Sequence, residues 1–421
     1  MPALGALAVE PIYVAVDTAI IGRVGTSELA GLAAAATILA LVVAGSNFLA
    51  YGTTERVARA LGGGQTDTAR SVATQSLWVA ILLSLVFVFV LITGAPSLIA
   101  LVGVDGLAAS YGVRYLRIAT LGLPAVLIAI AAQGVLRGAG DYRRPLIALG
   151  LGNVLNVIIE LPLVFTFGLS VTGSAVSTVI SQWVVAFVFF PMLRPLVGTR
   201  GERGPIRREM LRLLMIGRNL VLRVVSMLAV LTGAALLAAR GGVSDLASHQ
   251  IVAGTFMLLA LVLDAVSVPA HTLIGQALGA GDDHGARHIS VRVFTLSILG
   301  GIVLAVMVCA LAGPVAGIFS VDPQVRASAA EGLVVLGIIL VPGAVAFAGD
   351  GVLIGAGDHR FLGIASTMQA LVMIPFLFLP EIARGPGVSS IWLLLGVWMV
   401  MRALTVTARC RSLFWSSGPH R

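Results

Sequence analysis

The chain has 421 residues, of which 58% are hydrophobic and only 11% charged, and its formal net charge is +8. Soluble domains carry about 25% charged residues. This composition, with a mean hydropathy of +1.03, therefore excludes an ordinary soluble protein and predicts a polytopic membrane protein. All 27 basic residues are arginine, so the chain lacks the lysine that a P-loop or a Schiff-base enzyme requires.

Apolar runs of about 20 residues, the length that spans a hydrocarbon core, recur along the whole chain. They predict twelve transmembrane helices, at roughly 3–22, 31–53, 73–95, 108–133, 146–167, 172–193, 213–238, 246–271, 290–313, 328–349, 361–380 and 388–408. Because twelve is even, both termini are expected on the same side of the membrane.

Arginine placement orients these spans. Loops after even-numbered spans contain Arg56, Arg59, Arg70, Arg137, Arg143, Arg144, Arg200, Arg203, Arg207, Arg208, Arg287 and Arg360. Loops after odd-numbered spans contain only Arg23, Arg240, Arg326 and Arg384. By the positive-inside rule, the even loops and both termini are expected in the cytoplasm. The net positive charge therefore reflects the orientation of the chain in the membrane, and we expect no nucleic-acid partner.

An internal repeat organises the chain into two halves. GVLRGAGDYR at 134–143 returns as GVLIGAGDHR at 351–360, and the same displacement of 217 residues relates LGGGQ at 61–65 to LGAGD at 278–282. These glycine-rich strings are expected to form turns. The repeat predicts an N-terminal six-helix lobe at 1–193, a cytoplasmic linker at 194–212 and a C-terminal six-helix lobe at 213–421. Parallel repeats of this kind enclose a cavity between them, which favours transport.

The two halves differ in their buried polar residues. The first span, PALGALAVEPIYVAVDTAIIG, carries Glu10 and Asp17, and the fifth carries Asn156 and Glu160. The residues found 217 positions later are all apolar: Met227, Ala234, Met373 and Leu377. The N-terminal half alone is therefore expected to contain a carboxylate site, because acids within membrane spans are costly and usually functional.

Spacing predicts how these groups meet. Glu10 and Asp17 lie two helical turns apart, and Asn156 and Glu160 one turn apart. At 1.5 Å per residue, Asp17 and Glu160 both lie roughly 7 to 11 Å from the outer ends of their helices, so we expect them to be neighbours. The cluster could carry a proton, or its oxygens could ligate Na⁺. Pro11 is expected to act as a hinge between the two acids of the first span.

A second set of candidates is weaker. Asp264 and His271 are seven residues apart on one face of the eighth span, and Asp264 corresponds by the repeat to Asn47. Asp264, Asn47 and Tyr13 are candidates for lining a substrate cavity, and Asp264 could equally form a helix–helix hydrogen bond. His271 is expected near the interface in a structural role. Arg218 and Arg223 are expected to act as cytoplasmic anchors.

The strings VDTAIIGRVGTSELAGLA, LRGAGDYR, IGAGDHR and NVLNVIIELPLVF resemble the multidrug and toxic compound extrusion (MATE) family, most of all its DNA-damage-inducible protein F (DinF) branch. The resemblance covers nearly the whole chain. It implies an all-α membrane protein whose twelve helices form two parallel six-helix repeats in a V-shaped, two-lobed transporter. It also implies export of organic cations or amphipathic compounds in exchange for H⁺ or Na⁺. The family's span-1 aspartate matches Asp17, and its Asn-x-x-x-Asp pattern matches Asn156 with Glu160 in place of aspartate.

Other functions were weighed against this one. A flippase or exporter of lipid-linked precursors, found in the same superfamily, would need a strongly cationic cavity, whereas the predicted cavity spans hold acids and few buried arginines. The sequence has no nucleophile–base motif and no metal-ligand spacing, so we expect neither an enzyme nor a cofactor. The expected partners are a small-molecule substrate, a coupling H⁺ or Na⁺ and the lipid bilayer of the plasma membrane, with the chain acting as a monomer.

Overall fold

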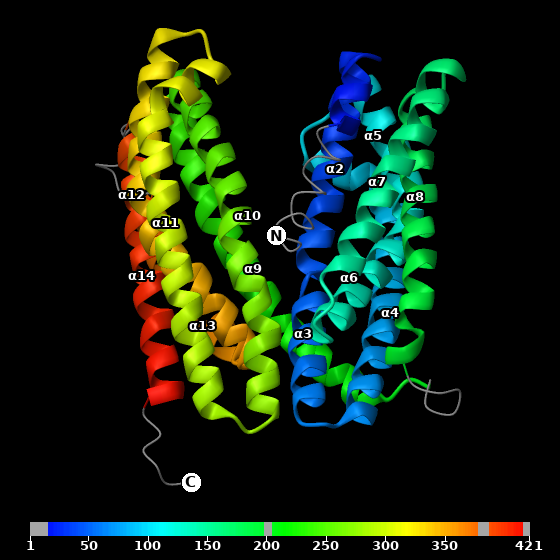
Figure 1. Ribbon diagram of the computed structural model, residues 1–421. Helices are drawn as coiled ribbons and strands as arrows, with labels where there is room; N and C mark the ends of the chain where they lie inside the picture. The colour runs from blue at the N-terminus through cyan, green and yellow to red at the C-terminus, as the bar shows by residue number, and fades with distance from the viewer. Residues whose placement is uncertain (1–15, 198–203, 378–386, 416–421) are drawn as a thin grey trace. The chain divides into compact units, whose positions relative to one another are not determined.

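The computed structural model describes residues 16–197, 204–377 and 387–415 (Figure 1). Within these ranges the chain is helical and contains no β-strand. Eleven helical stretches of the described residues are long and apolar enough to cross a membrane. The first predicted span falls mainly on residues 1–15, outside the described residues, and its end at 16–22 is helical. The prediction of an all-α, multi-pass membrane protein is confirmed.

The helices form two series along the chain. The first comprises α2 (Thr26–Ser46), α3 (Phe48–Gly62), α4 (Thr66–Leu101), α5 (Gly106–Ala119), α6 (Leu123–Gly138), α7 (Arg143–Leu161) and α8 (Ser170–Leu193). The second comprises α9 (Arg207–Arg240), α10 (Val243–Gly279), α11 (Asp283–Phe319), α12 (Pro323–Gly355), α13 (His359–Leu377) and α14 (Val388–Trp415). Two short connections extend these spans: a 3₁₀ turn joins α5 to α6, and a π-helical turn follows α7.

Most helices are longer than the apolar runs that predicted them. Arg56 and Arg59, expected in a loop, lie inside α3, and Arg137 lies inside α6. The physical reason is that a hydropathy window marks only the segment matched to hydrocarbon, whereas backbone hydrogen bonding carries a helix on into its polar ends. All three lie within two turns of a helix end; the side chain of Arg59 is 43% exposed, whereas Arg137 is buried.

The displacement of 217 residues found in the sequence also relates the helix boundaries. Five boundaries recur at this offset, namely Thr26 with Val243, Gly62 with Gly279, Thr66 with Asp283, Gly106 with Pro323, and Gly138 with Gly355. One difference stands out. The chain breaks between α2 and α3 at Asn47, whereas its counterpart Asp264 lies within the uninterrupted α10.

The repeated glycine-rich strings end helices, as predicted. After α6, Gly140 has a positive φ of 85° and the backbone N–H of Asp141 donates to the carbonyl of Leu136 at 2.8 Å. The N–H of Asp358 donates to Leu353 at 2.9 Å in the same way after α12. This is the Schellman ending, which requires a left-handed residue that glycine adopts without strain. The string GAGD therefore specifies the turn and recurs because both halves need it.

Close helix packing recurs as well. A Cβ at Gly134 on α6 would lie 2.8 Å from the carbonyl oxygen of Ala50 on α3. At the equivalent place, a Cβ at Gly351 on α12 would lie 2.7 Å from the carbonyl oxygen of Ser267 on α10. Small residues let transmembrane backbones approach this closely, where packing and polar contacts replace the hydrophobic effect. The glycine positions thus preserve one helix arrangement in both halves.

The helices group into two compact units, Met1–Gly217 and Arg218–Arg421. The boundary falls within α9. In the first unit α3 packs on α6, α2 on α5, and α7 on α8. In the second, α12 is central and packs against α10, α11 and α14. The six residues 198–203, part of the predicted linker, lie outside the described residues.

Candidate functional site

One buried face of α7 carries the polar pair predicted from the sequence. The buried residues of this helix are Pro145, Ala148, Gly152, Asn156 and Glu160, spaced three and four apart along a single face. Asn156 is 2% exposed and Glu160 is fully buried. The packing of α7 against α8 turns this face inward, so both polar groups lie inside the first unit.

Two local features bring α8 close to Glu160. The helix of α7 widens into the π-helical turn Pro162–Thr166, because Pro162 has no N–H for the regular ladder. On α8, a Cβ at Gly173 would lie 3.0 Å from the carbonyl carbon of Leu163. Only glycine allows this approach without a shift, and it places Ser174, the next residue, beside the acids.

Asp17 completes the cluster from the helical segment 16–22. It is 6% exposed, and the hydroxyl of Ser174 donates to its Oδ1 at 2.6 Å. Glu160 lies close enough to Asp17 and Ser174 to interact with both side chains. The predicted proximity of Asp17 and Glu160 is therefore present in the structure.

The amide of Asn156 links this cluster to α8. With its nitrogen toward Glu160, it donates to Oε2 at 3.1 Å, and its oxygen accepts from the backbone N–H of Thr178 at 3.1 Å. This orientation satisfies both ends of the amide, whereas the reverse one would point oxygen at oxygen. Oε1 of Glu160 accepts no hydrogen bond from any described residue. A proton held between the two carboxyl groups would supply one.

Electrostatics favours a proton or a cation that reduces the repulsion between the two carboxyl groups. Two ionised carboxylates about 4 Å apart repel each other by roughly 4 kcal/mol at the effective dielectric of a protein site. Ser174 and Asn156 each offer one hydrogen bond to the pair and no positive charge. Acid pairs in this position share a proton or bind a cation, because neither carboxylate is otherwise neutralised.

The equivalent positions of the second unit form an apolar core. Asp17 corresponds to Ala234, Asn156 to Met373, Glu160 to Leu377, Ser174 to Ile391 and Thr178 to Leu395. All five counterparts are buried and belong to one hydrophobic cluster. Even the geometry is retained, because a Cβ at Gly233, next to Ala234, would lie 2.9 Å from Leu377 Cδ1. The polar cluster is thus a feature of one half of a common scaffold.

The other residues that the sequence suggested as site candidates are not among those described in this cluster. Glu10, Pro11 and Tyr13 lie outside the described residues. Asn47 occupies the break between α2 and α3, and Asp264 lies in the second unit. His271 is 3% exposed and packs against α12, where a Cβ at Gly355 would lie 3.1 Å from its Cα; its expected depth near the membrane interface stays a prediction.

A buried ion cluster in the second unit was missed from the sequence. Asp350 on α12 accepts from Arg402 on α14 at 2.6 Å and from Arg223 on α9 at 2.5 Å. Arg402 also lies over the ring of Trp398, 5.1 Å from its centroid. Asp264 lies near enough to feel the charges of all three. The expectation that Arg223 is a surface anchor was therefore wrong, because its side chain is only 12% exposed and paired inside the unit.

The sequence did contain evidence for this cluster, but the predicted helix boundary hid it. The predicted tenth span ended at residue 349, which put Asp350 in a loop, whereas α12 continues to Gly355. Arg402 is an arginine inside an apolar run, and such a residue requires a partner in the membrane. The described residues include two buried arginines, Arg402 and Arg137, which are 3% and 8% exposed. Both are compensated, Arg402 by Asp350 and Arg137 by a 2.9 Å bond to Gln133.

No group of three or more histidine, cysteine, aspartate or glutamate side chains suited to a metal occurs among the described residues. A sodium ion would have a different set of ligands. Carboxylate, amide and hydroxyl oxygens of Asp17, Asn156, Glu160 and Ser174 are the hard donors that such a cation prefers. The cluster can therefore hold either a shared proton or a small hard cation.

Comparison with known proteins places this architecture in a family. The family model described as MatE matches twice, at residues 2–161 and 220–379. Protein DETOXIFICATION 44, chloroplastic, of Arabidopsis thaliana is 30% identical over 96% of this chain and 79% of its own length. DNA damage-inducible protein F of Escherichia coli is 26% identical over 97% and 89%.

Solved structures agree on the fold. A MATE crystal structure in the bent conformation superposes with a TM-score of 0.92 at 20% identity, covering 99% of this chain and 94% of that one. A MOP superfamily transporter from Pyrococcus furiosus reaches a TM-score of 0.90, also at 20% identity, covering 98% and 94%. The family model matches each half once and so follows the repeat seen in the helices. The chain belongs to the MATE family of multidrug efflux transporters and is not an enzyme.

Proposed function

We propose that this protein exports organic cations or amphipathic compounds in exchange for protons, and that Asp17 and Glu160 carry the coupling proton. The observation behind the proposal is the pair itself. Two buried carboxyl groups lie close together, and Oε1 of Glu160 has no hydrogen-bond donor among the described residues. A pair arranged in this way changes its net charge by one when a single proton leaves.

Coupling follows from competition at one cluster. When the proton leaves, the pair becomes doubly ionised in a medium of low dielectric, and its attraction for an organic cation rises. When a proton enters, that attraction falls and the cation is released. By linkage, the substrate must weaken proton binding as much as the proton weakens substrate binding. Alternating access then requires the two forms of the pair to favour different conformations of the protein.

The first span is proposed to transmit this change. Asp17 lies at its described end, and Pro11, outside the described residues, would let the helix bend between Glu10 and Asp17. Because the second unit has Ala234, Met373 and Leu377 at the equivalent places, the proposal assigns the proton to the first unit alone. We further propose that the protein works as a monomer in the plasma membrane with both termini in the cytoplasm.

The alternative of a lipid-linked precursor exporter is not favoured. Two arginines are buried, but Asp350 neutralises Arg402 and Gln133 accepts a hydrogen bond from Arg137. The described residues therefore form no strongly cationic interior of the kind that a pyrophosphate group would require.

The experiment that tests the proposal uses purified protein in proteoliposomes. A fluorescent organic cation is the substrate, with a pH gradient and a sodium gradient imposed in separate arms. Parent protein should transport under the pH gradient without sodium, and Glu160→Gln should lose this transport. Transport driven by sodium alone would instead assign a sodium ion to the same oxygens and overturn proton coupling. Equal transport by Glu160→Gln and parent would remove Glu160 from the mechanism.

A further inference from the structure

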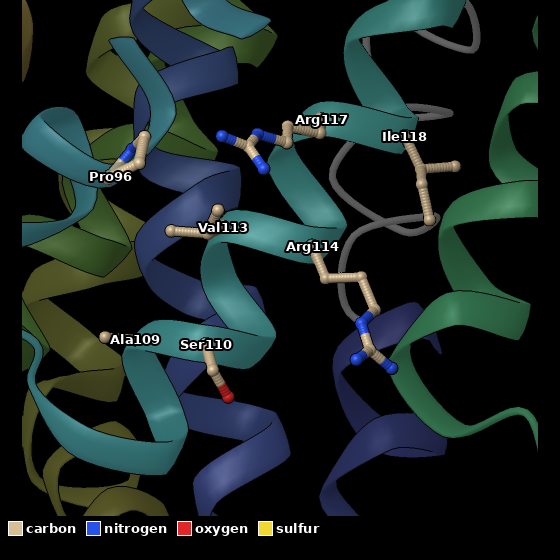
Figure 2. Close-up of a pocket in the computed structure, with 7 residues that line it drawn as sticks. All are labelled: Pro96, Ala109, Ser110, Val113, Arg114, Arg117 and Ile118. Carbon is tan, nitrogen blue, oxygen red and sulfur yellow. The ribbon is translucent and has the colours of Figure 1, made fainter. Parts of the chain in front are cut away.

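A pocket of about 540 Å³ lies between α4 and α5, away from the acid cluster. Figure 2 shows its lining, in which Arg117 extends toward the side of Pro96 and Val113 while Arg114 follows the opposite edge of α5. The remaining lining residues are Ala109, Ser110 and Ile118. Most of the wall is therefore apolar, and an arginine stands at each edge.

The length of its helix predicts that the pocket lies at the level where lipid headgroups meet acyl chains. The continuous span Gly106–Gly138 has 33 residues, which makes it about 50 Å long, some 20 Å longer than a hydrocarbon core. Arg114 and Arg117 lie about 12 and 16 Å from its start. Arg114 leans toward the N-terminal end of α5, as helix side chains do, whereas Arg117 extends toward α4, where it donates to the carbonyl of Ile92 (Figure 2).

The neighbouring face of α4 is exposed and apolar. Leu85, Val86 and Phe89 are 56%, 57% and 70% exposed, values expected of side chains that contact lipid. Pro96 lies seven residues after Phe89, two turns along the same face. The pocket therefore opens beside a surface that acyl chains cover.

The arginines have little compensation from the protein. Arg114 makes no hydrogen bond or ion pair with any described residue, and Nε of Arg117 donates to the carbonyl of Ile92 at 3.4 Å. Glu28, the acid bonded to the neighbouring Tyr111, pairs with neither arginine within the described part of the chain. An arginine at this depth is costly unless an anion meets it. A phosphate diester is the anion available at a membrane surface.

The repeat supplies an independent comparison. The residues 217 positions after Arg114 and Arg117 are Glu331 and Val334. Because the helix boundaries Gly106 and Pro323 correspond, the equivalent positions of the second unit lack the paired arginines, and one arginine, Arg326, stands at the position of Ala109. The scaffold therefore does not require these charges, which points to a ligand as their purpose.

We propose that this pocket binds an anionic phospholipid, with its headgroup phosphate at Arg114 and Arg117 and an acyl chain along the exposed face of α4. The ligand sits on the lipid-facing side of the first unit and takes no part in the proton exchange proposed above. Its expected effect is to stabilise the first unit in membranes rich in anionic lipid.

The test compares lipid binding by four forms of the protein in mild detergent. Thermal unfolding and native mass spectrometry are recorded with added phosphatidylglycerol, phosphatidylcholine or inorganic phosphate. Parent protein should retain phosphatidylglycerol and unfold at a higher temperature with it, and the other two additives should have little effect. Arg114→Gln/Arg117→Gln should bind phosphatidylglycerol roughly 30-fold more weakly, given the usual contribution of an arginine near a charged membrane surface.

Two further variants separate the pocket from charge alone. Ser110→Trp fills the pocket while both arginines remain, and it should also lose phosphatidylglycerol. Arg326→Gln removes an exposed arginine at the corresponding end of the second unit and should bind like the parent. The proposal is overturned if Ser110→Trp or the double variant binds like the parent, if Arg326→Gln loses as much as the double variant, or if inorganic phosphate alone reproduces the stabilisation.

Discussion

The hydroxyl of Ser174 donates a hydrogen bond to Oδ1 of Asp17 at 2.6 Å, across 157 residues of sequence. This bond fixes the position of a carboxyl group that also contacts Glu160. It leaves the other oxygen of Asp17 available for a proton or cation. A conservative substitution of Asp17 should therefore keep an oxygen that accepts this hydrogen bond.

Asp17→Asn should abolish transport driven by a pH gradient while the protein still folds. The amide oxygen can accept from Ser174, but the side chain can no longer gain and lose a proton. The measurement is substrate flux in proteoliposomes, alongside the thermal unfolding temperature. Asp67→Asn, which alters a carboxyl group that is 83% exposed, serves as control and should transport normally. Normal flux in Asp17→Asn would make Asp17 a structural residue.

Ala234→Asp should not restore transport to Asp17→Asn, and by itself it should lower the unfolding temperature. Ala234 is fully buried in the hydrophobic cluster that contains Met373 and Leu377. An acid there meets no donor, and burying an unpaired charge costs several kcal/mol. Unfolding in detergent, followed by intrinsic fluorescence, measures the effect. An unchanged unfolding temperature would show that water reaches this core.

Asp350→Asn should destabilise the second unit by about 3–5 kcal/mol, because it leaves two arginines buried without their common anion. The control is Asp358→Asn, which breaks a pair at 2.6 Å between the turn after α12 and Arg409 on α14. That arginine is 38% exposed, so the control should cost less than about 1 kcal/mol. Denaturant unfolding in mild detergent compares the two. Similar losses for both variants would argue against a tightly coupled cluster.

Gly173→Ala should lower both stability and transport. The new methyl group would lie 3.0 Å from the backbone of Leu163, so α8 must move away from the π-helical turn and carry Ser174 with it. Overpacking of this kind costs about 1–3 kcal/mol. Gly150→Ala is the matched control, because a Cβ at Gly150 has no atom within 4 Å. That variant should be neutral or slightly stabilising, and a cost equal to that of Gly173→Ala would contradict the explanation.

The topology can be tested by cysteine labelling. In a background of Cys309→Ser and Cys410→Ser, Asp67→Cys should react with a membrane-impermeant maleimide only in inside-out vesicles. Val321→Cys, at a side chain that is 94% exposed, should react only from the outside. The expectation rests on arginine asymmetry between even and odd loops. Reversed labelling would invert the orientation and would also reverse the direction of the proposed proton exchange.

The sequence alone was sufficient for the scaffold. Hydropathy marks helices that cross a membrane, since lipid requires every backbone group to bond within its own helix. The repeated GAGD string could be recognised because a Schellman ending needs a left-handed glycine, and the ending needs no distant contact. The offset of 217 residues then predicted the matched halves and the polar residues that break their symmetry. These are local or periodic properties, so they can be read without coordinates.

Only the tertiary structure decided which polar groups meet. Spacing suggested that Asp17 and Glu160 are neighbours, but Ser174 and Thr178 join them through the approach that Gly173 allows. Asp350 was missed because its partners, Arg223 and Arg402, lie 127 and 52 residues away on other helices. A charge inside an apolar run signals that a partner exists, and the fold decides which side chain supplies it. Helix packing brings distant residues into contact, and no local pattern encodes that pairing.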